Sequence, residues 1–249
     1  MNKEWSLKEL YSDFDAPEFA SDEKALDKAI ADMVAFCNDI KGEPADVLKK
    51  GIQLMSDFNN LATKLFCFAQ LVQSANTSDA NAAATIGRLS QKLSAIAGPR
   101  TLFVRFVAGI DNLDELIESD SVLKEFEFML KTIRDNEKYT LSPEVENVLS
   151  LYSISGSSAW SELQGYLTST VPVEYEGGVT SLSDIRNKAY DPDKNIRKSA
   201  YEAELKAYDR IKDAIAYSLN SIKLETINRC KLRGYESPLD EALKGAHMK

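Results

Sequence analysis

The chain has 249 residues, a formal net charge of −9 and 44% hydrophobic residues. This length can bury one large core or two smaller ones, and the hydrophobic content excludes a disordered chain. The negative charge argues against nucleic acid as the main partner, and the low counts of glycine (11) and proline (7) favour helices over many short strands.

The first half of the sequence predicts consecutive helices. Residues 1–20 are rich in aromatic side chains and predict an extended or turn-rich arm. Ser21 precedes two acids and is typical of a helix N-cap, and apolar residues then recur at helical spacing up to residue 40. Three further helices are predicted to begin near Pro44, after Ser78-Asp79 and after Gly98-Pro99. Their short connections predict antiparallel neighbours.

The middle of the chain predicts shorter helices and one hairpin. A helix is expected over about 121–134, and Ser142-Pro143 is a strong helix start because proline is favoured at the first helical position. Short helices are then expected at 143–153 and 158–167. Residues 168–175 are rich in β-branched side chains and predict an edge strand, which returns after Gly177-Gly178 as a short partner at 179–181.

A long amphipathic pattern follows Asp191-Pro192 and predicts one helix to residue 232, about 60 Å long. Small residues dominate its inner stripe, and the pairs Glu202–Lys206 and Glu225–Arg229 are expected on its outer side. We therefore expect a structural spine. A further helix is predicted at Ser237-Pro238, with Asp240 in the position of a capping box.

The histidine and cysteine residues predict no catalytic or metal centre. His247 is the only histidine, and it lies next to the C-terminus. Cys37, Cys67 and Cys230 have no CxxC spacing, so we expect reduced thiols, with Cys37 and Cys67 acting as small core residues. The N-terminus lacks an apolar signal segment, and the longest apolar run, 65–72, is too short to cross a membrane. A soluble cytoplasmic protein is expected.

Three other features each allow two interpretations. Residues 186–233 carry a net charge of +5, which either faces acidic groups or is simply solvated; the second is favoured. Five tyrosines could line a peptide groove, although rims of the core are the favoured reading: Tyr166, Tyr175, Tyr201, Tyr208 and Tyr217. The acids Asp111, Asp114, Glu115 and Glu118 are expected to be solvated, and Glu144 and Glu146 are expected at a helix start. No catalytic, cofactor-binding or metal residue is predicted.

Several short segments, in this order, resemble the oligoendopeptidase F family of thimet-oligopeptidase-like zinc metallopeptidases. They are the opening Trp5, Leu7, Leu10 and Tyr11 with Phe14 and Phe19; residues 139–146 with Ser157 to Trp160; Asp191-Pro192-Asp193 with Arg197, Ala200 and Tyr201; and Ser218, Asn220 and Arg233-Gly-Tyr235. Each segment is weak alone. Together they cover the chain from its first residues to its last.

The resemblance implies an all-α, two-lobed peptidase that admits short peptides and uses zinc held by an HExxH helix. No HExxH occurs in the sequence, so no family catalytic residue has a matching position. The expectation is an N-terminal fragment of a zinc metallo-oligoendopeptidase, inactive alone, with zinc and peptide substrates belonging to the intact parent. The alternative is a standalone helical scaffold or peptide- or protein-binding module. The oligomeric state is left open.

The same resemblance suggests three parts along the chain. Residues 1–115 are expected to form an N-terminal helical lobe. Residues 116–190 are expected to form a family-type helical segment with the hairpin, and 191–249 the beginning of the catalytic domain. The predicted fold is thus an antiparallel multi-helix bundle with one small β-hairpin and a long spine helix.

Overall fold

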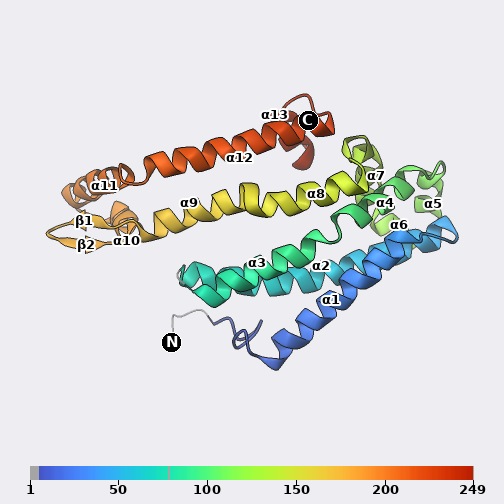
Figure 1. Ribbon diagram of the computed structural model, residues 1–249, viewed down its shortest axis with the longest axis horizontal. Coiled ribbons are helices and arrows are strands. Elements are labelled where there is room, and N and C mark those ends of the chain that lie inside the picture. Colours follow the sequence, from blue (N-terminus) through green and yellow to red (C-terminus); the bar gives the residue numbers. More distant parts are fainter. Residues whose placement is uncertain (1–5, 78, 249) are drawn as a thin grey trace. The chain divides into compact units, whose positions relative to one another are not determined.

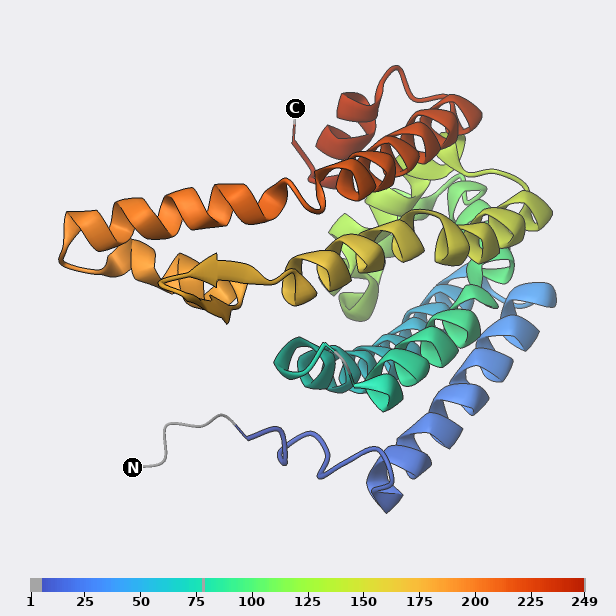
Figure 2. The ribbon, with the colours of Figure 1, turned by 60° about the vertical axis from the view of Figure 1, so that its left-hand side comes forward.

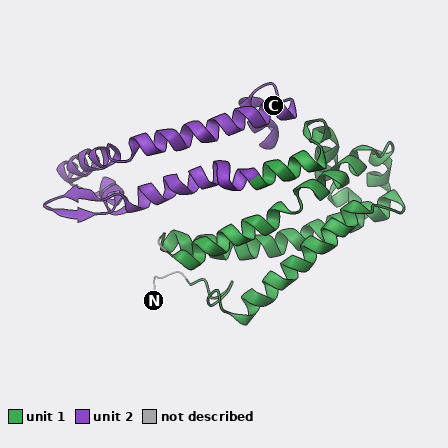
Figure 3. Ribbon diagram, viewed as in Figure 1, with its two compact units in different colours: residues 1–151 green, residues 152–249 purple. Residues whose placement is uncertain are grey.

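A computed structural model describes residues 6–77 and 79–248. Its regular elements are helices and one two-stranded hairpin, which confirms the predicted all-α class (Figure 1). The chain folds into two compact units: unit 1 comprises residues 1–151 and unit 2 comprises residues 152–249 (Figure 3). The three-part division at 115/116 and 190/191 stays a prediction. Trp5 of the opening motif and Ser78 of the predicted third helix start lie outside the described residues.

Four helices form the main body of unit 1. They are α1 (Pro17–Asn38), α2 (Pro44–Ala75), α3 (Ala80–Ser94) and α4 (Ala97–Ala108). Helix α2 contacts α1 and α3, as the short connections predicted, whereas α4 packs against α1 and does not lie beside α3. The starts of α2 and α3 agree with the sequence, and the side chain of Asp79 caps α3 by accepting a hydrogen bond from the Ala82 N–H.

Aromatic packing holds the N-terminal arm against helices α1 and α2 of unit 1. Tyr11 makes edge-on contacts with Phe19 and Phe68, at centroid distances of 5.0 and 5.2 Å. Its hydroxyl donates a 2.7 Å hydrogen bond to Asp22, whose carboxylate also binds Lys64. Burial and this bond raise the pKa of Tyr11. Helix α1 begins at Pro17, before the predicted cap Ser21, because proline already satisfies the first helical position.

The remaining elements of unit 1 are short. They are α5 (Leu113–Ser119), α6 (Ser121–Glu125), α7 (Glu127–Asn136), a 3₁₀ turn (Glu137–Tyr139) and α8 (Pro143–Ser153). Helix α5 was not predicted, and the single helix expected over 121–134 is two helices. The backbone of Phe126, with φ −98° and ψ 14°, separates them. The predicted start at Pro143 is confirmed.

Unit 2 begins with a π-turn and contains the hairpin. Its elements are the π-turn (Ile154–Ser158), α9 (Ala159–Thr170), β1 (Val173–Tyr175), β2 (Gly178–Thr180), α10 (Leu182–Asn187), a 3₁₀ turn (Lys188–Tyr190), α11 (Lys194–Tyr208), α12 (Lys212–Arg233) and α13 (Pro238–Gly245). Tyr175 pairs with Gly178 across a tight turn in which Glu176 and Gly177 both have positive φ. The predicted strand is shorter than expected, because residues 168–170 complete the last turn of α9.

The predicted single helix from 192 to 232 is wrong, because residues 209–211 interrupt it between α11 and α12 (Figure 2). The break turns Ile211 into the core of unit 2, where it is 6% exposed. It also lets Arg210 reach the hairpin, where it binds Glu174 at 2.5 Å and the carbonyl of Pro172 at 3.3 Å. Apolar burial and these bonds compensate for the helix hydrogen bonds lost at the break.

Candidate functional site

The described residues do not form a zinc site. No group of three or more His, Cys, Asp or Glu side chains converges among residues 6–77 and 79–248. A zinc site needs three or four such ligands. His247 lies just beyond α13, with a positive φ of 54°. Nor does any helix in this part of the chain combine the length and apolar character needed to cross a bilayer.

The three cysteines occupy two different environments. Cys37 and Cys230 are buried, whereas Cys67 is exposed on α2, so the expectation that Cys67 is a core residue is wrong. Burial raises the pKa of Cys37 to about 11. Burial, together with the hydrogen bond to Glu241, also raises the pKa of Cys230. These shifts keep both buried thiols protonated and unreactive at neutral pH.

The tyrosines do not converge on one described groove. Tyr166, Tyr201 and Tyr217 are exposed. Tyr208 is half-buried and donates to Glu204 at 2.5 Å, while the hydroxyl of Tyr175 lies 3.2 Å from Ser199 on α11. These contacts give Tyr175 a structural role at the hairpin and Tyr208 a structural role on α11.

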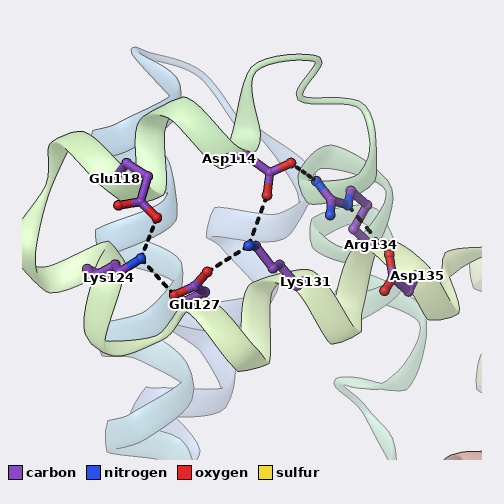
Figure 4. A network of polar contacts seen from close by, with 7 residues as sticks. All are labelled: Asp114, Glu118, Lys124, Glu127, Lys131, Arg134 and Asp135. Carbon is purple, nitrogen blue, oxygen red and sulfur yellow. Dashed lines mark hydrogen bonds and ion pairs between the residues drawn. The ribbon is translucent and has the colours of Figure 1, made fainter.

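The acidic patch near residue 114 belongs to an ion-pair network rather than to solvent alone (Figure 4). Asp114 binds Arg134 at 2.9 Å and Lys131 at 3.3 Å, and Lys131 also binds Glu127 at 2.6 Å. Lys124 joins Glu127 to Glu118. The network links α5, α6 and α7, so Asp114 and Glu118 stabilise a local fold, whereas the neighbouring acids Asp111 and Glu115 are exposed, as expected.

A hollow of about 570 Å³ lies at the turn between α1 and α2. Phe36 and Leu54 contribute its apolar walls. Two of its acids already pair with lysines, Asp39 with Lys41 and Asp46 with Lys49. Its charges therefore favour a structural interpretation.

The most specific polar arrangement in unit 2 is at the π-turn. Gly156 has a backbone outside the helical region, with φ −93° and ψ −116°. Glu225, from α12, accepts hydrogen bonds from the N–H of Ser157 at 2.6 Å and from its hydroxyl at 2.8 Å. A Cβ at position 156 would lie 2.4 Å from the Glu225 carboxylate. The glycine thus makes room for the acid that satisfies the irregular turn.

This arrangement was not predicted from the sequence, because the spacing of Glu225 and Arg229 indicated a pair along one helix. Arg229 instead donates to Glu241 of α13 through Nε and Nη2, at 3.1 and 3.0 Å. The thiol of Cys230 donates to the same carboxylate at 3.0 Å. The other expected pair is also replaced, because Lys206 binds Glu174 at 3.5 Å. Spacing alone could not indicate that tertiary partners would compete for these side chains.

Helix α12 also has an exposed side, which we call the outer face of α12 and define as Tyr217, Asn220, Leu224, Ile227 and Lys231. All five residues are exposed. Their spacings of three, four or seven residues bring them to one side of the helix. The opposite side contacts α9 and the π-turn, and it buries Ser218 and Cys230.

Residues 108–171 match a family model described as oligopeptidase F. The fold resembles oligoendopeptidase-F from Enterococcus faecium, with a TM-score of 0.75 and 17% identity over 92% of this chain. It also resembles a protein assigned as an oligoendopeptidase F from Bacillus anthracis str. Ames, with a TM-score of 0.63 and 14% identity over 94% of this chain. No curated protein shows a significant sequence match.

The chain spans 47% and 40% of the lengths of these two structures. At such identities the likeness establishes a shared fold, and the matched segment adds an independent sequence relationship over 64 residues. The segment and the fold together confirm that this chain resembles the oligoendopeptidase F family.

Proposed function

We propose that this chain is the N-terminal helical portion of a zinc metallo-oligoendopeptidase that hydrolyses short peptides. The observation that carries the proposal is the fold match over 92% of this chain to 47% of the Enterococcus faecium enzyme. The matched segment at 108–171 supports the same family. No three His, Cys, Asp or Glu side chains converge among the described residues, and the sequence contains no HExxH, so the proposal places hydrolysis outside this chain.

The role proposed for the chain is therefore to build a helical lobe of the enzyme and not to supply reacting groups. The cysteine pattern, with three free thiols, fits a reducing compartment such as the cytoplasm. Zinc would be held by histidines of an HExxH helix elsewhere in the intact protein. When bound there, zinc would polarise the peptide carbonyl and activate water.

Two measurements test the proposal. The coding sequence beyond codon 249 is expected to contain an in-frame HExxH, whereas an immediate stop would favour the standalone scaffold or binding module. The purified 249-residue chain is expected to bind no stoichiometric zinc and to leave short quenched fluorescent peptides intact. Metal-dependent cleavage by the pure chain would contradict the proposed inactivity.

A further inference from the structure

The outer face of α12 carries three large apolar side chains that are exposed. Tyr217, Leu224 and Ile227 are 73%, 59% and 40% exposed. Large apolar side chains gathered on one helix face mark an interaction surface more often than scattered ones do.

The inner face of the same helix is already occupied. It packs on α9, and Glu225 binds the π-turn. A helix with apolar residues on opposite sides is typical of one buried between two layers. Within unit 2, the described elements supply only one of these layers.

The charge of the outer face indicates what would cover it. Between Ala214 and Arg233 the only acid is Glu225, which is bound to Ser157. The exposed charges here are Lys231 of the face and Lys223 beside it. A fitting partner would therefore present apolar side chains with carboxylates at their edge.

We propose that the outer face of α12 is the docking surface for the part of an oligoendopeptidase that lies outside the region matched by this chain. The inference rests on the proposed function. The two solved structures have more than half of their length outside the matched region, which is enough chain to provide the missing layer. Docking covers Leu224 and Ile227 and brings acidic groups to the lysines.

Thiol labelling tests the inference on the 249-residue chain and on the intact protein encoded by the same gene. Leu224→Cys is made in a Cys67→Ser background, because Cys67 is the exposed native thiol. Val179→Cys, on the hairpin and 72% exposed, is the matched control. Maleimide labelling of Leu224→Cys is expected to be at least about tenfold slower in the intact protein, relative to Val179→Cys, than in the 249-residue chain.

The outcomes separate this inference from the proposed function. Equal relative labelling of Leu224→Cys in both proteins overturns the docking surface and leaves the peptidase proposal in place. A reading frame that stops without HExxH overturns the peptidase proposal and the docking inference with it. Protection of Leu224→Cys in the 249-residue chain that rises with its concentration identifies a second copy as the occupant, which also overturns the inference. Labelling in guanidinium chloride checks that every introduced thiol is reactive.

Discussion

The carboxylate of Glu225 on α12 takes both hydrogen bonds that Ser157 offers at the π-turn, from a position 68 residues further along the chain. It accepts from the backbone N–H and from the hydroxyl of one residue. One side chain thereby satisfies the irregular turn and connects it to α12.

Replacing this acid should destabilise unit 2. Glu225→Ala removes both acceptors and leaves the N–H of Ser157 without its partner, so we expect a loss of about 1.5–3 kcal/mol in the free energy of unfolding. Urea denaturation followed by circular dichroism measures the loss. Glu202→Ala, on the exposed side of α11, is the control and should change stability by less than about 0.5 kcal/mol. Equal effects of the two variants would contradict the role of Glu225.

Adding a methyl group at Gly156 should lower the free energy of unfolding, because the methyl group would meet the carboxylate of Glu225. We expect Gly156→Ala to cost about 1–3 kcal/mol, since its Cβ would lie 2.4 Å from Glu225 Oε2. Gly165→Ala on α9 is the control: its Cβ meets nothing within 4 Å, so it should stabilise the chain by about 0.4–1 kcal/mol. In a double-mutant cycle, Glu225→Ala should relieve part of the cost at position 156. Strict additivity would show that the two residues do not clash.

A close helix contact in unit 1 gives a parallel prediction. A Cβ at Gly51 of α2 would lie 2.4 Å from the ring of Phe103 on α4. Gly51→Ala should therefore destabilise unit 1 by about 1–3 kcal/mol, whereas Gly87→Ala on α3, with open space around its Cβ, should be stabilising. Thermal unfolding of both variants compares them directly. A stabilising Gly51→Ala would mean that α2 and α4 are further apart in solution.

The ion-pair network of unit 1 should make stability depend on pH. The hydrogen bond from Arg134 lowers the pKa of Asp114 below its ordinary value of 3.8, and that from Lys131 lowers the pKa of Glu127 below 4.5. A carboxyl whose pKa is lower in the folded chain than in the unfolded chain adds to the free energy of unfolding. This contribution is fully present at pH values above the unfolded-state pKa, and it is lost as the pH falls through the folded-state pKa. Urea unfolding across this acidic range should show that the free energy of unfolding falls less with decreasing pH for Asp114→Asn than for the native chain.

Asp111→Asn is the control for the network, because Asp111 is a neighbouring exposed acid that takes no part in the ion pairs drawn in Figure 4. It should leave the pH profile unchanged. The contribution of Asp114 should also weaken in 1 M salt, where the Debye length is about 3 Å. An identical pH profile for Asp114→Asn and the native chain would contradict a contribution from this network.

The thiols should report their burial through their reactivity. Cys67 is exposed and should react with a disulfide reagent in the folded chain, while Cys37 and Cys230 should react only after unfolding. We therefore expect about one fast thiol in buffer, and Cys67→Ser should abolish it. Two or more fast thiols in the native chain would show that the cores around Cys37 or Cys230 open readily.

Local signals in the sequence predicted helix starts well. Pro44, Pro143 and Pro238 each begin a helix, and Ser237 accepts the cap hydrogen bond that the capping box predicts. These signals act over three or four residues, so they can be read without knowing the fold. The hairpin turn at Gly177 was predictable for the same reason.

Interruptions within helices were not predictable in this way. The break before Ile211 depends on a core made by the hairpin and α11, and Phe126 divides another predicted helix. Likewise, Glu225 and Arg229 have helix spacing for a pair, but Ser157 and Glu241 bind them instead. Long-range partners decide these cases, and helix periodicity carries no information about them. The apolar side chains on the outer face of α12 were not predicted either, because they follow the same helical spacing as the buried ones.

The close approach at the π-turn also constrains how the sequence can evolve. Any side chain at position 156 would occupy the space that the Glu225 carboxylate fills. Such a side chain would displace the carboxylate from Ser157, so it should be tolerated best where residue 225 is smaller. Among related sequences, a larger residue at position 156 should therefore occur together with a smaller residue at position 225.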